Sequence, residues 1–413
     1  MVGWPKKPGG VDEGETAMSA VPAGIEPVVA LLGSFPPREC GIATFTRDLF
    51  HALSAGGHAT RGVAAIDEPG AVRRYGPDVR WRLDQDDPRS YDHLATALDR
   101  AGADVLSIQH EFGLFGGHDG ELLLRLLDRL VTPAVVTLHT VLGAPSGHLR
   151  QLTRALCDSS AATVVLARAA IPLLADVYGV DPAKVHYIPH GIPTVKRTRG
   201  SRRRTKAALG LSGRTVLSTF GLIGPSKGIE HVIRALPEVV RAHPDLLYVV
   251  LGQTHPGQLR HAGEEYRESL QGIVAELGLE RHVRFDARYL DQDELVRWLL
   301  ATDVYLMPYL DPEQIVSGTL AYAVGSGKAV VATQFRYARE LLSGGRGELV
   351  PFRDSDAITR KLLRLLGDRP ALAGMERRAY EASREMEWPN VAAAYRRLFA
   401  RLAAPAARGQ RIA

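Results

Sequence analysis

Short apolar or β-branched runs alternate with stretches of helical periodicity along most of this chain, and no other feature limits the fold as strongly. A strand that is apolar along its whole length is typical of a parallel sheet covered by helices on both faces. In the first half we predict strands at 28–32, 61–66, 105–108, 134–138, 163–167 and 185–188, and a helix at 121–130. In the second half we predict strands at 215–220, 247–251, 283–285, 304–307, 329–332 and 348–350, and helices at 229–242, 264–277, 293–301 and 356–366. The alternation therefore predicts the α/β class, with two parallel-sheet domains.

The domain boundaries follow shifts in composition. A Gly- and Pro-rich stretch without periodicity is typical of a disordered tail, and a basic run separates the two α/β regions. We therefore divide the chain into a tail (1–26), a first α/β domain (27–195), a basic linker (196–212), a second α/β domain (213–385), a terminal amphipathic helix (386–404) and a short tail (405–413). A length of 413 residues fits two or three domains.

Composition is that of an ordinary globular protein, with 45% hydrophobic and 23% charged residues. No apolar run reaches the roughly 18 residues that a membrane-spanning helix needs, and the N-terminus lacks an apolar signal core. Two cysteines, Cys40 and Cys157, make no disulfide framework, which favours a reducing, cytoplasmic location. Neither lies in a Cys/His cluster, so we expect no metal site, and nothing indicates a cofactor.

The basic run at 196–206 holds seven Lys or Arg residues in eleven positions, whereas the net charge of the whole chain is only +5. One interpretation is a solvated interdomain linker, because blocks of like charge are commonly exposed. The alternative is weak contact with anionic lipid headgroups at the inner face of the membrane, or with polyphosphate. Nucleic acid is not an expected partner, because no aromatic side chains are interleaved for stacking and no binding module is recognisable.

Ligands of open parallel sheets bind at the carboxyl ends of the strands, so the loops there are the candidate site. In the first domain, Gly41 and Thr44 lie at the entry of a helix, where an anion is favoured, although a simple helix cap explains them equally. The next such loop places His110 beside Glu111; either could contact a sugar hydroxyl or assist proton transfer, unless the loop only satisfies its own polar groups. His139 follows the strand after that, where it is either a core histidine or a ligand contact.

The second domain offers three more groups at strand ends. Gly221 is followed by Lys227 and Gly228, and His255 lies at the end of the next strand. Further along, 317–319 (Ser317, Gly318, Thr319) open a small-residue helix. Free N–H groups and the positive end of the helix dipole favour an anion there, although capping alone is the common explanation.

The segment 311–333 resembles the donor-site signature of the family 4 retaining glycosyltransferases, which have the GT-B fold of two Rossmann-like domains facing a cleft. Its end, Val330-Val331-Ala332-Thr333, matches the end of the pattern Glu-x7-Glu…Ala-x-Ala-x-Gly-x-Pro-Val-Val-Ala-Thr. That anchor puts Gln314 and Tyr322 where the family has two glutamates. The order of the other motifs is similar too: a glycine loop, a histidine after a strand, the Pro-His-Gly-Ile turn at 189–192 and Lys-Gly at 227–228.

The resemblance implies roles for these residues. We predict Lys227, His139 and Glu111 as the catalytic residues. By the resemblance, Lys227 would neutralise the donor phosphates and His139 would contact the transferred sugar. Glu111, a candidate from its own loop, would hold sugar or acceptor. The remaining donor-side candidates are Gly41, Gly221, Gly228, Gln314, Ser317, Gly318, Thr319 and Tyr322. The remaining candidates for acceptor or sugar contact are Thr44, His110 and His255. The resemblance also implies that the terminal helix crosses back onto the first domain.

Three residues depart from the family's pattern and leave the donor open. Leu222 stands where an arginine would contact phosphate, and Gln314 and Tyr322 stand where the family has glutamates. Tyr322 cannot accept two ribose hydroxyls as a glutamate does. The leading hypothesis is retaining transfer of a sugar from a nucleoside-diphosphate donor to a carbohydrate or other hydroxyl acceptor. The alternatives are a glycoside phosphorylase that uses inorganic phosphate, and a non-catalytic protein of the same fold that binds a sugar or a partner.

Overall fold

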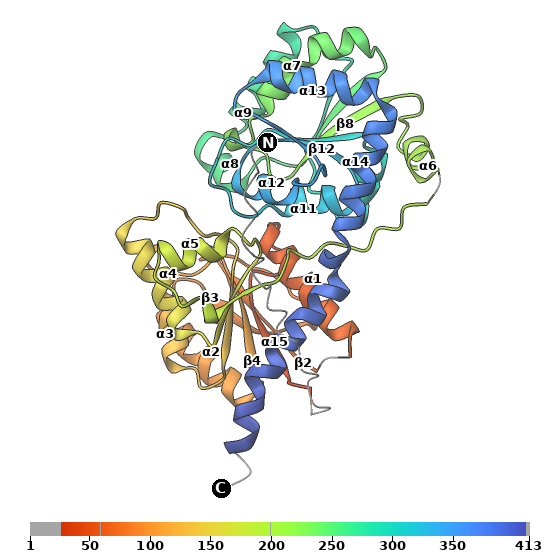
Figure 1. Cartoon of the computed structure of the whole chain (residues 1–413). Coiled ribbons are helices and arrows are strands. Elements are labelled where there is room, and N and C mark those ends of the chain that lie inside the picture. The colour runs from red at the N-terminus through yellow and green to blue at the C-terminus, as the bar shows by residue number, and fades with distance from the viewer. Residues whose placement is uncertain (1–25, 58, 199, 410–413) are drawn as a thin grey trace, which may run out of the picture.

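The computed structural model describes residues 26–409 except 58 and 199, with side chains described up to 403. It contains two α/β domains, stacked one above the other in Figure 1 and linked by the segment near α6 and by the long final helix. The predicted tail at 1–26 lies outside the described residues apart from Glu26. Across the described part of the chain, no helix is long and apolar enough to cross a membrane.

The first domain is a seven-stranded sheet in the order β3-β2-β1-β4-β5-β6-β7, and every adjacent pair is parallel. Its strands are β1 (Val29–Gly33), β2 (Thr60–Asp67), β3 (Val79–Asp84), β4 (Val105–His110), β5 (Ala134–Leu138), β6 (Ala162–Val165) and β7 (Val185–Tyr187). Its helices are α1 (Gly41–Ala55), α2 (Pro88–Arg100), α3 (Leu122–Arg129), α4 (Gly147–Ser159) and α5 (Ala170–Asp176). The six predicted strands are confirmed to within two residues, and β3 was not predicted. This edge strand carries charged side chains and only one buried residue, so it lacks the apolar run of its neighbours.

The second domain is a six-stranded parallel sheet in the order β10-β9-β8-β11-β12-β13. Its strands are β8 (Thr215–Phe220), β9 (Leu246–Leu251), β10 (Val283–Asp286), β11 (Val304–Met307), β12 (Ala329–Thr333) and β13 (Glu348–Val350). Its helices are α7 (Ile229–Ala242), α8 (Pro256–Ala262), α9 (Glu265–Glu276), α10 (Gln292–Ala301), α11 (Gly318–Gly325), α12 (Arg336–Leu341), α13 (Ser355–Gly367) and α14 (Arg369–Ala382). The central strands are buried along their whole length because helices cover both faces, which is what their unbroken apolar sequences predicted.

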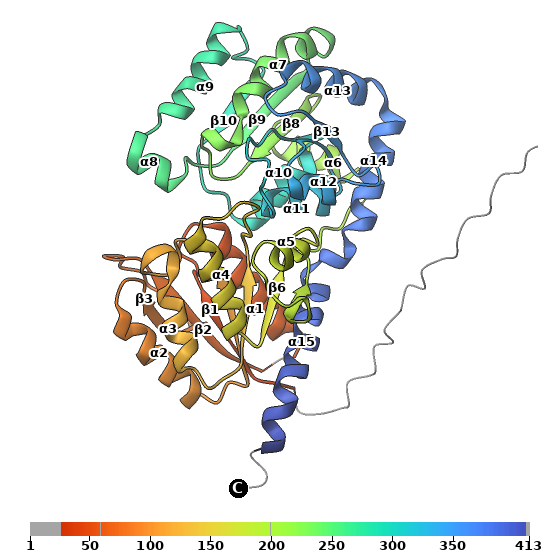
Figure 2. The same ribbon diagram turned by 60° about the vertical axis from the view of Figure 1, so that its left-hand side comes forward.

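The final helix, α15 (Trp388–Gly409), leaves the second domain and packs against α1 of the first, as Figure 2 shows along one side of that domain. Trp388 covers Gly191, where a Cβ would meet the indole ring at 2.3 Å. Further along, the hydroxyls of Tyr395 and Thr137 are hydrogen-bonded at 3.0 Å. The predicted crossover is confirmed, but the helix runs beyond the predicted end at 404, to Gly409.

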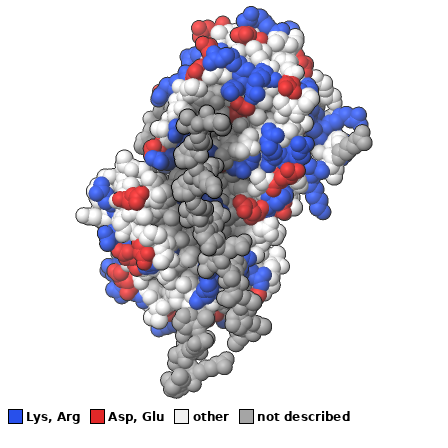
Figure 3. Space-filling view, viewed as in Figure 1, with Lys and Arg blue, Asp and Glu red and all other residues white. Residues whose placement is uncertain are grey.

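The basic segment is not a solvated linker throughout, because part of it is the helix α6 (Ser201–Ala208), packed on α10. Arg202 forms ion pairs with the buried carboxylates of Asp303 and Glu376, and Lys206 pairs with Asp303. The sequence could not indicate this, because the acidic partners lie about a hundred or more residues away. Figure 3 shows Lys and Arg gathered at the edge of the molecule where α6 lies. Contact of the exposed charges with anionic lipid stays a prediction.

Candidate active site

A cleft of about 580 Å³ lies between the two domains and is lined by residues of both. From the first domain come the start of α1 and the loops that follow β4, β5 and β7. From the second come the loops after β8, β9 and β11 and the first turn of α11. The carboxyl ends of both sheets therefore face the same space, which is where ligands bind in open parallel sheets.

Most of the candidate residues line this cleft. They are Gly41, Thr44, Glu111, His139, Gly221, Lys227, His255, Gln314, Gly318, Thr319 and Tyr322. Three candidates are not part of the lining: His110, Gly228 and Ser317. Gly228 has φ of 61° and lies so close to Pro308 that a Cβ would meet its carbonyl oxygen at 2.3 Å, so it shapes the turn after Lys227. Ser317 is buried and caps α11 by accepting from the Leu320 N–H.

Lys227 supplies the cleft with positive charge. It ends the single 3-10 turn η3 (Pro225–Lys227), and its ammonium lies 3.8 Å from the centroid of the Tyr309 ring. A cation over an aromatic face is held in place without being neutralised. Among the described residues, no carboxylate lies within ion-pair distance of Lys227, so its charge is available to an anionic ligand.

His255 stands beside Lys227 on the second-domain wall, although the sequence assigned it to the acceptor side. Its Nδ1 accepts a hydrogen bond from the Gly257 N–H at 3.1 Å. Burial, the charge of Lys227 and that of Arg260 lower its pKa below the ordinary value. The neutral ring must therefore carry its proton on Nε2, so His255 can donate a hydrogen bond.

The first turn of α11 meets the cleft through Gly318 and Thr319. The hydroxyl of Thr319 is hydrogen-bonded to those of Ser317 at 3.0 Å and Tyr309 at 3.1 Å. Gly221, with φ of 130°, lies against the Thr319 methyl, which a Cβ would meet at 3.2 Å. Gly221 therefore lets its loop approach the first turn of α11 closely, and the helix dipole adds partial positive charge to this wall of the cleft.

His139 and Glu111 form the first-domain wall. His139 Nε2 donates to Gln109 Oε1 at 3.0 Å, and its ring meets Phe45 edge-on. Burial, with repulsion from His190 and His110, holds the pKa of His139 well below its usual value, so the ring is neutral. Glu111 accepts hydrogen bonds from the Thr140 hydroxyl at 2.8 Å and the Phe112 N–H at 3.0 Å. Burial raises the pKa of Glu111 although these two bonds oppose it, so this carboxyl takes up a proton more readily than usual.

The predicted ligand role of His110 is not supported. Its side chain is wholly buried, lies parallel to the Phe115 ring at 5.9 Å between centroids, and is not in the cleft lining. Both ring nitrogens lack a hydrogen-bond partner among the described residues. Burial lowers the pKa of His110 to about 4. The sequence misplaced it because His110 is the last residue of β4 rather than the first of the loop.

Tyr322 and Gln314, which replace the two glutamates, have separate surroundings. The Tyr322 hydroxyl donates to Asp48 Oδ2 at 3.2 Å. Gln292 Nε2 donates both to Asp48 Oδ2 and to the hydroxyl oxygen of Tyr322. Since Asp48 belongs to α1, this network joins the two domains across the cleft. The Gln314 side chain instead donates to the Val316 carbonyl of its own loop.

Sequence reasoning missed His190, which follows β7 and lies in the cleft lining. The Pro-His-Gly-Ile turn was interpreted as hinge structure alone. His190 Nδ1 donates to the Gly191 carbonyl at 2.7 Å, so Nε2 is the acceptor of the neutral ring, and burial lowers its pKa to about 4. Gly318 leaves room for it, because a Cβ there would meet Nε2 at 3.0 Å. The available signal was a histidine in the loop after a strand: His190 lies three residues past the end of β7, and His139 directly follows β5.

Further contacts hold the domains together around the cleft. The Thr44 and Tyr289 hydroxyls are hydrogen-bonded at 3.2 Å, and Gln253 donates to Glu39 at 2.8 Å. At the far side, the Glu340 carboxylate accepts from the N–H groups of residues 168 and 169 at the start of α5. The arrangement can therefore hold an anionic group at Lys227 and a polyhydroxyl group between it and the first-domain wall.

Two family models match the chain. "Glycosyl transferases group 1" matches residues 201–386, and "Glycosyltransferase Family 4" matches residues 40–196. The chain therefore belongs to the group 1 glycosyltransferases of family 4.

Similar proteins agree with this assignment. A GDP-mannose-dependent alpha-(1-6)-phosphatidylinositol monomannoside mannosyltransferase from Mycolicibacterium smegmatis is 32% identical over 49% of this chain and 52% of its own. A phosphatidyl-myo-inositol mannosyltransferase from the same organism is 30% identical over 45% of each chain. This chain thus spans about half the length of the curated relatives it matches. Sucrose-phosphate synthase from Thermosynechococcus elongatus superimposes with a TM-score of 0.73 at 17% identity, over 92% of this chain and all of that one, which confirms the GT-B fold.

Proposed function

We propose that the protein transfers a sugar from a nucleoside-diphosphate donor to a hydroxyl acceptor, with retention of the anomeric configuration. One observation carries the proposal: Lys227, without an acidic partner among the described residues, lies beside the start of α11, and His139 and Glu111 line the same cleft. Positive charge at one side and hydrogen-bonding groups at the other suit a phosphorylated sugar.

The reaction has one main electrostatic demand. As the bond between the anomeric carbon and the donor's phosphate oxygen breaks, negative charge grows on that phosphate. Lys227 and the α11 N-terminus neutralise it, and preorganised charge of this kind is commonly the largest catalytic term. The acceptor oxygen forms its new bond to the anomeric carbon on the face that the phosphate leaves. The departing phosphate oxygen takes the acceptor's proton, which needs no metal and no enzymic nucleophile.

The remaining groups position the two substrates. Neutral His139 and the protonatable Glu111 can contact sugar hydroxyls. His255 can donate from Nε2 to a phosphate oxygen, so we now place it on the donor side. His190 Nε2 can accept from a sugar hydroxyl near Gly318.

The names of the relatives suggest what to test first. One specifies GDP-mannose, and both specify a phosphatidylinositol-type acceptor. We therefore propose a nucleoside-diphosphate hexose as donor and a carbohydrate or inositol hydroxyl as acceptor, with GDP-mannose as the first candidate.

A glycoside phosphorylase remains the second candidate, for a specific reason. Leu222 brings no guanidinium to the phosphate, and Tyr322 is hydrogen-bonded to Asp48 rather than free for a ribose. A site that binds only inorganic phosphate needs neither group. A non-catalytic binding role is less well supported, because nothing described in the chain neutralises Lys227.

Ligand-dependent melting separates these functions, since a ligand that binds only the native state must stabilise it. The melting temperature of the full chain is measured with GDP, UDP, ADP and inorganic phosphate. We expect a nucleotide to raise it most, and the corresponding labelled nucleotide sugar then to label an acceptor with an unchanged anomeric configuration. Stabilisation by phosphate alone would favour the phosphorylase, an inverted product would refute retention, and no stabilisation by any of the four would favour the non-catalytic role.

A further inference from the structure

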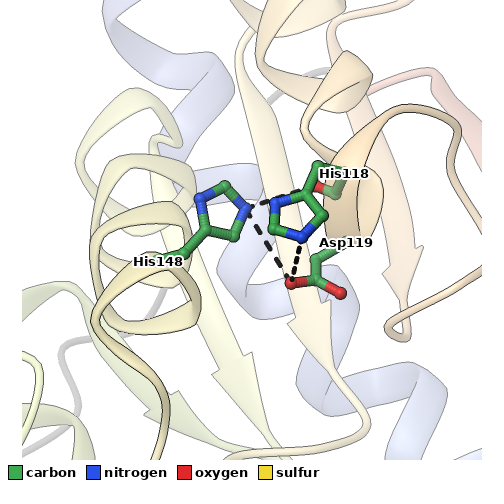
Figure 4. A group of neighbouring side chains, drawn as sticks. All are labelled: His118, Asp119 and His148. Atoms are coloured by element: carbon green, nitrogen blue, oxygen red, sulfur yellow. Dashed lines mark hydrogen bonds and ion pairs between the residues drawn. The ribbon is translucent and has the colours of Figure 1, made fainter.

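A second cluster of polar side chains lies on the first domain, outside the cleft lining. His118 and Asp119 belong to the short 3-10 turn η1 (His118–Gly120), and His148 lies in the first turn of α4. Figure 4 shows both imidazole rings and the carboxylate directed at one another. Asp119 Oδ2 is 3.8 Å from His118 Nε2 and 3.9 Å from His148 Nε2. Among the described His, Cys, Asp and Glu residues, these three form a group whose ligand atoms all lie within 4.8 Å of one another.

The local backbone makes this convergence possible. Asp119 has φ of 56°, a left-handed conformation that is uncommon outside glycine and is tolerated best by Asp and Asn. This turn carries the Asp119 carboxylate back to the side of His118. His148 comes from a separate element, whose first turn is capped by the Ser146 hydroxyl. The loop alone offers only two of the three groups, so its sequence shows no complete set of metal ligands.

We propose that His118, Asp119 and His148 bind one divalent transition-metal ion, with Zn²⁺ as the first candidate. Two imidazoles and a carboxylate are a common three-ligand set for such ions, with water in the fourth position. Bonds of about 2.0–2.2 Å to a tetrahedral ion require ligand atoms about 3.4 Å apart. The two separations from Asp119 Oδ2 exceed this by about 0.5 Å, which side-chain rotation can supply.

Little competes for the ligand atoms of this cluster among the described residues. No Lys or Arg of the described part of the chain pairs with Asp119, so the charge of its carboxylate is not neutralised. The contact of His148 Nε2 with the His118 carbonyl is long, at 3.4 Å. The two imidazole rings are tilted by 40° and their centroids lie 4.2 Å apart. An ion bound to a nitrogen of each ring would offset the cost of holding the two rings so close together. The side chains are partly exposed, so an ion can enter from solvent.

Such an ion would brace the first domain rather than take part in transfer. The loop that begins at Glu111 ends at η1, so a metal bridge from η1 to α4 fixes the far end of the segment that carries Glu111. None of the three ligands lines the cleft.

The test is titration calorimetry of metal-free, tag-free full chain with zinc chloride, repeated with cobalt chloride followed by visible absorption. We expect one ion per chain with a dissociation constant in the micromolar range. His118→Ala, His148→Ala and Asp119→Asn should each weaken binding by more than about tenfold, since even the loss of a group outside the metal's own ligands costs that much in metal sites. Asn keeps the left-handed backbone, so Asp119→Asn removes charge without straining the turn.

His51→Ala is the matched control. His51 also pairs with a carboxylate, Asp78 at 2.9 Å, but without a third such group among the described residues. This variant should bind zinc as the wild type does. Wild-type binding that is too weak to detect, or that is unchanged in His118→Ala and His148→Ala, would overturn the proposal. The readout is metal binding alone, so its failure and a failure of the proposed transfer are distinguishable.

Discussion

Replacing Lys227 by Met is the sharpest test of the proposed donor site. Met keeps most of the apolar stem that packs near Tyr309 and removes only the charge. Lys227 ends a short turn in a loop and has no acidic partner among the described residues, so no carboxylate loses its counter-charge. We therefore expect the fold to persist and the affinity for a nucleoside diphosphate to fall.

The size of the effect follows from the environment of the ammonium. A unit charge about 4 Å from a phosphate oxygen gains about 4 kcal/mol at the effective dielectric of about 20 that suits sites near a surface. The free enzyme already gains part of this from the ring of Tyr309, where a cation at 3.8 Å contributes about 0.5–2 kcal/mol. Because Lys227 is only half-buried, water screens the phosphate contact further. A net loss of about 2 kcal/mol, or about 30-fold in dissociation constant, is expected.

The assay is calorimetric titration with the nucleotide that stabilises the wild type most. Lys361→Met is the matched control, because Lys361 is also a half-buried lysine of the second domain but pairs with Glu348 and lies outside the cleft lining. Its nucleotide affinity should equal that of the wild type. A dissociation constant for Lys227→Met within about threefold of wild type would refute the assignment of Lys227 to the donor phosphates.

Three further predictions concern residues whose surroundings the structure defines. Tyr322→Glu should weaken binding of each nucleoside diphosphate at least about tenfold in calorimetry, because a second carboxylate beside Asp48 in the cleft would repel the anionic ligand; tighter binding would contradict this. Arg202→Ser should lower the free energy of unfolding in urea by about 2 kcal/mol, because the buried carboxylates that Arg202 pairs with lose a partner. Arg203 is an exposed neighbour, and Arg203→Ser should change the free energy of unfolding by less than about 0.5 kcal/mol. Equal losses in the two variants would contradict the structural role of Arg202. The free energy of unfolding of His110→Leu minus that of the wild type should rise as the pH falls from about 6.5 to about 4. Urea unfolding at several pH values measures this difference. Over that interval the unfolded chain protonates His110 while the folded chain does not, so acid destabilises the wild type through this group; a pH-independent difference would refute the account.

Much of the fold could be predicted because its strands are buried on both faces. An unbroken apolar run such as β9 marks such a strand directly, and all twelve predicted strands are present. The missed strand β3 is an edge strand, whose pairing depends on β2 and not on a local apolar pattern. The same limit applies to α6, where ion pairs with Asp303 and Glu376 place a basic helix against the second domain.

The site was predictable to the extent that strand ends define it. Lys227 and His139 follow strands, and both line the cleft. Contacts between the two domains could not be read from local sequence, and Asp48 illustrates this, because nothing in α1 marks it as a partner of Tyr322. The proposed metal site could not be predicted from local sequence either, because His148 joins His118 and Asp119 only through the packing of α4.

The departures from the donor pattern are connected through Asp48. A carboxylate accepts about four hydrogen bonds. Asp48 Oδ1 accepts two from Arg47, and Oδ2 accepts one each from Gln292 and Tyr322. Although Asp48 brings a carboxylate close to the place where the family has a glutamate, it has no acceptor site left for a ribose. A glutamate at 322 would instead repel Asp48, so Tyr322 and Asp48 are best understood as one unit that joins the domains. Any ribose must either replace hydrogen bonds of this unit, opening the cleft, or be recognised by other groups.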